Sequence, residues 1–212
     1  VREEVLPYQY NILNDAIPGI EKSHAIENIR LAAEKLRGKD VKPDEFYGMV
    51  FQDSDVAKWI EAAAYALAAG EDPELEKAVD ETIQLYGASQ HEDGYVDSYF
   101  TVKCPDKMWT NICDAHELYC AGHMMEAAVA YYEVTGKREL LDIMSKSADC
   151  IYEQFMKKNT RAYPGHPEVE LALMRLWRAT GNEKYKELAK HFVDVRGQAP
   201  NYFVEEKKKG QT

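Results

Sequence analysis

Apolar residues recur every three or four positions along most of the chain, which is the spacing of a helix that buries one face. Capping residues, glycines and prolines separate these stretches and mark where one helix ends and the next begins. The pattern predicts helices over residues 23–36, 53–70, 73–87, 114–135, 137–156, 167–180 and 183–195. Residues 94–100 are the only candidate for a strand. We therefore predict an all-α protein.

An internal repeat shows how these helices are paired. Thr135-Gly136 recurs 45 residues later as Thr180-Gly181, and apolar and acidic positions after each pair match at the same offset. Each unit is predicted to be a helix, a tight glycine turn and a second helix that runs antiparallel to the first. Stacked hairpins of this kind build either an open solenoid or a closed α/α toroid.

The connections between the hairpins favour the toroid. Residues 89–112 and 159–166 are long, unequal in length and rich in Tyr, His, Asp and Gly, whereas a solenoid uses short and regular connections. Irregular polar loops at one end of a helical stack also indicate a binding site there.

The length of the chain predicts that the toroid is incomplete. At roughly 45 residues a hairpin, 212 residues hold about three and a half hairpins, and a ring of six needs more. We expect residues 1–212 to be the N-terminal portion of a single α/α barrel domain, an incomplete α/α6 toroid. Its open edge would expose apolar side chains, which favours association into a homo-oligomer.

Charge and composition narrow the choice of partners. The chain has 37 acidic and 26 basic residues and a net charge of −11, which argues against nucleic acid or an anionic membrane surface as the main partner. No apolar stretch approaches the ~20 residues that cross a bilayer. The N-terminus lacks the apolar core of a signal peptide, and the four cysteines form no CxxC pair. We expect a cytoplasmic protein.

The first segment with candidate chemistry is 114–123. Asp114 and Glu117 have the spacing of a capping box, which predicts that the helix begins at residue 114. His116 then lies in the first turn, with Cys120 and His123 on the same face. These three side chains could bind zinc, form a polar stripe beside a substrate pocket, or pack in the core.

Further candidates lie at two other predicted helix starts. Pro167 suits the first position of a helix, which leaves His166 at the cap, where it either fills a turn or bonds a ligand hydroxyl. Asp53 belongs to a run of short polar residues that either cap a helix or line a pocket. The chain also has 14 tyrosines against 6 phenylalanines, and rings with a hydroxyl suit the binding of sugars.

Taken together, several segments resemble glycoside hydrolase family 127 (GH127), the β-L-arabinofuranosidases. The matching segments, in order, are VLPYQYNILND at 5–15, SHAIENIR at 23–30, FYGMVFQDSDVAKWIEAA at 46–63, DGYVDSYF at 93–100, HELYCAGHMMEAAVAY at 116–131 and YPGHPEVELAL at 163–173. They span nearly the whole chain. The resemblance implies the N-terminal half of the family's α/α6 barrel, without the later β-sandwich domains.

The resemblance also implies a function. It implies a retaining exo-glycosidase that releases β-L-arabinofuranose from an arabinofuranoside-type oligosaccharide, by means of a zinc-bound cysteine nucleophile and a glutamate acid/base. In the family these groups lie in the later part of the barrel, so the zinc ligands are expected outside this chain. We assign no catalytic or metal-binding residue within 1–212 and expect the chain alone to be inactive.

By position in the matching segments, Gln9, His116 and His166 are the implied substrate-binding residues. Asp53, Tyr99 and His123 are added as candidates because they lie near them in the motifs. The alternative from another class is a helical-repeat module that binds a glycan or a protein without catalysis. Downstream sequence with a glutamate followed by a cysteine-rich cluster would favour the enzyme.

Overall fold

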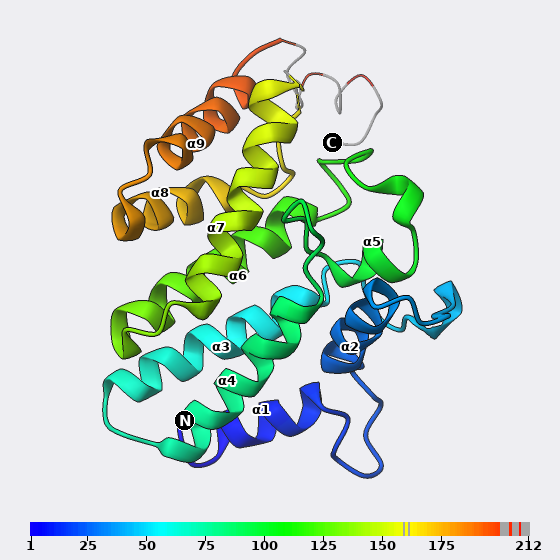
Figure 1. Ribbon diagram of the computed structural model, residues 1–212, viewed down its shortest axis with the longest axis vertical. Coiled ribbons are helices and arrows are strands. Elements are labelled where there is room, and N and C mark those ends of the chain that lie inside the picture. Colours follow the sequence, from blue (N-terminus) through cyan, green and yellow to red (C-terminus); the bar gives the residue numbers. More distant parts are fainter. Residues whose placement is uncertain (159, 161, 200–203, 205–207, 209–212) are drawn as a thin grey trace.

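A computed structural model describes residues 1–158, 160, 162–199, 204 and 208, and all of its regular secondary structure is helical (Figure 1). The all-α prediction is confirmed. The α-helices are α1 (Val5–Leu13), α2 (Ala25–Leu36), α3 (Asp53–Ala68), α4 (Pro73–Ala88), α5 (Ser98–Val102), α6 (Glu117–Thr135), α7 (Glu139–Tyr152), α8 (Val169–Thr180) and α9 (Glu183–Arg196). Short 3-10 turns occupy Pro43–Glu45 and Pro105–Lys107, and a π-helical turn, Glu153–Lys157, extends α7.

The helices form two layers of antiparallel hairpins. Helices α3, α6 and α8 pack side by side in one layer, and each packs against its hairpin partner, α4, α7 or α9, in the other. Figure 1 shows the three hairpins stacked along the long axis of the molecule. This arrangement is an arc of an α/α toroid, as the sequence repeat predicts.

The repeated Thr-Gly pair ends the first helix of two hairpins in the same way. Gly136 and Gly181 are the C-caps of α6 and α8, with φ angles of 74° and 73°, a left-handed conformation that glycine adopts at little cost. The hydroxyls of Thr135 and Thr180 each donate to a carbonyl four residues earlier, at 2.7 Å. The sequence repeat is therefore a repeat of one turn structure.

Helix α1 was not predicted from the sequence, because contacts distant in sequence hold it. The indole N–H of Trp59 donates to the carbonyl of Leu6 at 3.1 Å, and the ring of Tyr10 stacks on that of Trp59. Arg2 donates to the carbonyl of Gly70 at 2.7 Å, beyond the C-terminal end of α3. Helix α1 thus runs antiparallel to α3, with Leu13 near the end where α3 begins.

Three local predictions were wrong. Residues 94–100 are not a strand, because Asp97 accepts a hydrogen bond from the amide of Phe100 and begins helix α5. Helix α6 begins at Glu117 and not at 114, because the Glu117 carboxylate binds elsewhere in the fold instead of closing a capping box. Helix α8 begins at Val169, so His166 lies in the preceding turn and not at the cap.

One hydrophobic core fills the space between the two layers. A smaller cluster, formed by Leu31, Ala32, Val41, Phe46 and Val102, packs beneath the loops beside α2 and α5. Within the described residues, no helix is both long enough and apolar enough to span a membrane.

Candidate functional site

Three histidines surround one tyrosine where α6 and α8 begin. The ring centroid of Tyr119 lies 5.6 Å from that of His116, 4.5 Å from His123 and 5.1 Å from His166, and all three contacts are edge-to-face. The rings of His116 and His166 are also 5.1 Å apart. The structure therefore brings together all three histidines singled out in the sequence. We call these four residues, with Lys58, the histidine cluster.

A backbone contact sets the position of His166 against His116. The amide of Gly165 donates to the carbonyl of Cys113 at 3.1 Å, which ties the turn before α8 to the segment before α6. A Cβ atom at Gly165 would lie 2.2 Å from that carbonyl oxygen, so only glycine fits without a shift of the backbone. The two histidine-bearing segments are close because position 165 has no side chain.

A second glycine brings the start of α8 onto α6. A Cβ atom at Gly122 would lie 2.9 Å from Cγ of Glu168 and 3.0 Å from the amide nitrogen of Val169. This close approach places Oε1 of Glu168 3.3 Å from Nδ1 of His123. Gly122 therefore determines which carboxylate His123 meets.

Helix α3 contributes the remaining wall of the cluster. Nζ of Lys58 donates to the hydroxyls of Tyr119 at 3.0 Å and of Ser54 at 3.1 Å, and it lies 5.1 Å from the centre of the Tyr119 ring. Just before α3, the ring of Phe51 lies 5.3 Å from that of His116. The cluster thus draws side chains from α3, from the start of α6 and from the turn before α8.

Burial keeps one histidine of the cluster neutral. Desolvation lowers the pKa of His123 to about 4, with further lowering by Lys58 and His166, so His123 is neutral at pH 7. Burial also raises the pKa of Glu168. Nδ1 of His116 is buried without a hydrogen-bond partner among the described residues. The neutral ring of His123 and the unpartnered Nδ1 of His116 can each bond an uncharged hydroxyl ligand.

Gln9 lies in a groove that adjoins the cluster. The groove has a volume of about 490 Å³ and runs between α1 and α3. Its polar lining consists of Gln9, Ser23, Gln52, Asp55 and Lys58. Because Lys58 also bonds Tyr119, the groove and the histidine cluster share a wall. The three residues expected to bind substrate, Gln9, His116 and His166, thus border one region of the molecule.

The structure does not bring Asp53 and Tyr99 into this region. Asp53 is 4% exposed, and its carboxylate accepts hydrogen bonds from the amide of Ser98, at 2.7 Å, and from the hydroxyl of the same residue. Desolvation raises the pKa of Asp53. Tyr99 packs against Phe46 beside the smaller hydrophobic cluster. Asp53 links α3 to α5, and Tyr99 covers the α2 side of the fold.

Sequence reasoning missed Lys58 and Tyr119. Tyr119 could have been predicted from its spacing, because it stands three residues after His116 and four before His123, on the same helical face. Lys58 carried no such signal, since its contact with Tyr119 joins residues 61 positions apart.

The structure does not support zinc binding by His116, Cys120 and His123. Cys120 is 2% exposed, and burial raises the pKa of its thiol well above the usual value, which opposes the thiolate that zinc requires. No group of three or more His, Cys, Asp or Glu side chains within the described residues is placed to hold a metal ion. That zinc is bound by residues outside this chain stays a prediction.

Comparison with known proteins gives consistent results. A family model described as the GH127 catalytic domain of β-L-arabinofuranosidase matches residues 1–212. The non-reducing end β-L-arabinofuranosidase of Bifidobacterium longum subsp. longum is 41% identical over 97% of this chain and 33% of its own length.

Two solved structures agree with this result. The crystal structure of a GH127 β-L-arabinofuranosidase from Geobacillus stearothermophilus T6 is 52% identical, with a TM-score of 0.86 over all of this chain and 33% of its own. A GH127 β-arabinofuranosidase is 32% identical, with a TM-score of 0.82 over 96% of this chain and 33% of its own. The chain thus spans about a third of the length of these relatives.

Proposed function

Because the chain belongs to the GH127 β-L-arabinofuranosidase family, we propose that it is part of a retaining exo-glycosidase that hydrolyses β-L-arabinofuranosides. The chain spans about a third of its relatives, so this activity is proposed for the protein of which these residues are one part. The substrate class is an arabinofuranoside-type oligosaccharide. In that enzyme, residues 1–212 supply half of the sugar pocket.

The observation that carries this proposal is the position of His116 and His166 beside the groove that holds Gln9. Their rings are 5.1 Å apart, and Nδ1 of His116 has no partner among the described residues. A furanose presents several hydroxyls at close spacing, and each can donate to or accept from an imidazole or an amide. These hydrogen bonds are directional, so they orient the sugar for attack at its anomeric carbon.

The test measures hydrolysis of an aryl β-L-arabinofuranoside by the full-length enzyme. His116→Gln and His166→Gln are each expected to lower kcat/KM by about 10- to 100-fold, since each removes a hydrogen bond to the sugar. The matched control is His191→Gln on α9, which lies outside the cluster and should leave kcat/KM unchanged. Equal activity in all three variants would contradict the proposed role of the two histidines.

We further propose that the zinc, its cysteine nucleophile and the glutamate acid/base are supplied by residues outside this chain. Residues 1–212 expressed alone should therefore show no hydrolysis above background in the same assay. Robust turnover by this chain that is lost on chelation would contradict the assignment. If the full-length protein binds arabinofuranosides but never hydrolyses them, the alternative of a glycan-binding helical module is favoured instead.

We infer a cytoplasmic location for the protein. No disulfide joins the cysteines of the described residues, as is usual for a protein of a reducing compartment.

We also infer that the chain self-associates through the edge formed by α8 and α9. Leu171 on α8 and Val193 on α9 are 57% and 59% exposed, and such apolar side chains favour association. Sedimentation of the chain alone should show a dimer or larger species, which Leu171→Glu should dissociate; a monomer at micromolar concentration would contradict this.

A further inference from the structure

Two residues on either side of the loop between α1 and α2 adopt a conformation that their side chains disfavour. Asp15 has a φ angle of 57°, and His24, the N-cap of α2, has a φ angle of 54°. Residues other than glycine occupy this left-handed region rarely and at a cost in energy. Such a conformation persists only where surrounding contacts enforce it, so the contacts of both residues call for an explanation.

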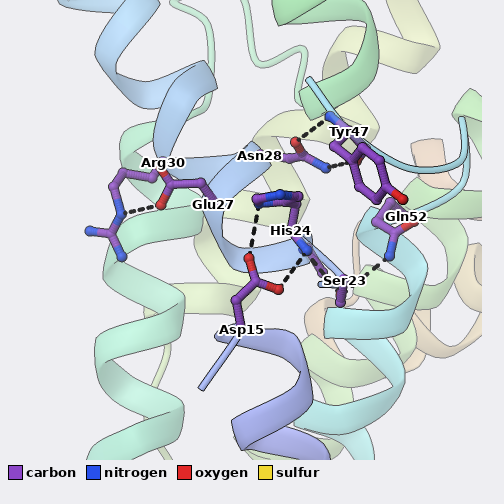
Figure 2. Close-up of polar contacts among 9 residues, drawn as sticks. Asp15, Ser23, His24, Glu27, Asn28, Arg30, Tyr47 and Gln52 are labelled. Atoms are coloured by element: carbon purple, nitrogen blue, oxygen red, sulfur yellow. Dashed lines mark hydrogen bonds and ion pairs between the residues drawn. The ribbon is translucent and has the colours of Figure 1, made fainter. Parts of the chain in front are cut away.

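The contacts form a clamp across the loop. Oδ1 of Asp15 accepts from the backbone amide of His24 at 2.9 Å, and Oδ2 lies 2.9 Å from Nδ1 of the same residue. Figure 2 shows the carboxylate bridging the backbone and the ring of His24. The side chains of Asp15 and His24 are only 13% and 28% exposed. One carboxylate therefore holds both ends of the loop together.

The residues next to this clamp bind the segment that leads into α3. Nε2 of Gln52 donates to Oγ of Ser23 at 3.4 Å, and Oε1 of Gln52 accepts from the amide of Met49 at 3.1 Å. One turn into α2, the buried side chain of Asn28 bonds both the amide and the carbonyl of Tyr47, at 3.3 Å and 2.7 Å (Figure 2). The start of α2 is thus joined to α1 on one side and to residues 47–52 on the other.

Both joined segments carry groups that border the proposed sugar site. Helix α1 carries Gln9, four residues before its last residue, Leu13. The segment 47–52 carries Phe51, which contacts His116, and Gln52, which lines the same groove as Gln9. The clamp therefore joins the helix that carries Gln9 to the segment whose Phe51 contacts His116.

We propose that Asp15 and His24 are positioning residues that hold Gln9 in register with His116. This proposal rests on the proposed function, because it assumes that Gln9 binds the substrate. Without the clamp, the end of α1 near Leu13 is anchored only by packing, whereas its start remains fixed by Arg2 and Trp59. A displacement of about 1 Å at a binding group is enough to lower activity by up to about 100-fold.

The experiment is a double-mutant cycle in the full-length enzyme. Asp15→Asn is expected to raise KM for an aryl β-L-arabinofuranoside about 10-fold with a smaller change in kcat, because a ground-state contact is lost. Gln9→Ala is expected to have an effect at least as large. In the Gln9→Ala background, Asp15→Asn should cause no further loss, because Asp15 acts through Gln9.

The matched control is Glu27→Gln on α2, the helix that His24 caps. Glu27 pairs with Arg30 at 3.1 Å, but both side chains are about half exposed, so its loss should change neither KM nor kcat. Rescue gives a second test. His24→Asn should retain more activity than His24→Ala, because Asn tolerates the left-handed backbone and can still bond Asp15. Thermal unfolding of each variant confirms that the assay temperature lies below its transition.

The outcomes separate the inference from the proposed function. If Asp15→Asn lowers kcat/KM by the same factor with and without Gln9, or lowers only the unfolding temperature, the positioning role is wrong while the proposed function stands. If Gln9→Ala has no effect, the assignment of Gln9 to the substrate fails, and the positioning role fails with it. A larger KM for Asp15→Asn that disappears in the Gln9→Ala background supports the inference.

Discussion

Two polar regions on the same three helices differ in how their groups are paired. The histidine cluster lies where α3, α6 and α8 begin. One to two turns further along, Arg175 bonds Glu126 and lies 3.4 Å from Glu61 and 4.0 Å from Glu133. Arg175 also contacts the hydroxyl of Tyr65, at 3.5 Å. We call these five residues the arginine network.

The arginine network is held by ion pairs, whereas the histidine cluster is held by ring contacts and by hydrogen bonds from one lysine. In the network, one guanidinium meets three carboxylates. In the cluster, His123 is neutral, Lys58 bonds two neutral hydroxyls, and Nδ1 of His116 has no partner among the described residues. Oε1 of Glu126 in the network likewise has no hydrogen-bond partner among the described residues, so the two regions differ in the kind of pairing: ion pairs in one, hydroxyl and ring contacts in the other. This difference supports the proposed sugar site at the beginning of the three helices.

Breaking the arginine network should produce the largest effect, and it should be an effect on stability. Arg175→Met leaves the carboxylate of Glu126, whose side chain is 9% exposed, without its cation. We expect a loss of about 3 kcal/mol in the free energy of unfolding, measured by urea denaturation. Combining it with Glu126→Gln should recover part of the loss. At temperatures below unfolding, kcat/KM should be unchanged, and a large loss of activity would contradict the division between the two regions.

Separating the two segments of the histidine cluster should affect activity more than stability. Gly165→Ala places a Cβ atom 2.2 Å from the carbonyl oxygen of Cys113 and forces His166 away from His116. We expect kcat/KM of the full-length enzyme to fall by about 100-fold. Gly136→Ala is the control: it is strained by its φ angle of 74° but meets no atom within 4 Å. It should cost about 1 kcal/mol of stability with full activity.

The smallest expected effect is a shift in the pKa of His123, in the histidine cluster. The pKa of His123, about 4, lies below the ordinary value of 6.5, so the unfolded chain binds more protons between those pH values. His123 therefore lowers stability as the pH falls from 6.5 towards 4. Lys58→Met removes a nearby positive charge and should raise this pKa by about one unit or less. A histidine NMR titration measures the shift, and an unchanged midpoint would show that burial alone sets it.

The candidate site was predictable from the sequence only where its residues share a helix or a motif. His116 and His123 lie on one face of α6, so their spacing alone indicated that they act together. Asp53 and Tyr99 were chosen because they stand in the matching motifs, but a motif also contains residues that hold the fold. The bonds from Ser98 to Asp53 join helices 45 positions apart, and no local pattern indicates whether a carboxylate faces a pocket or a neighbouring helix.

The hairpin architecture was determined by the sequence itself. Helical periodicity and the repeated Thr-Gly turn depend on contacts within a few residues, so they can be recognised in the chain before it folds. Helix α1 depends instead on Trp59 and Gly70, and the true start of α6 depends on the partners of Glu117; none of these is a neighbour in sequence. Tertiary structure decided these boundaries, because packing and buried hydrogen bonds outweigh local propensity.

The same division applies to function. The order and identity of the motifs determined the family and the residue types available for binding. Only tertiary structure decided that Tyr119 lies among three histidines, that Lys58 joins them to the groove of Gln9, and that Asp15 clamps His24. The physical reason is that a binding site is a set of distances between side chains. Those distances exist only after helices from separate parts of the chain have packed at positions such as Gly122 and Gly165, where backbones meet.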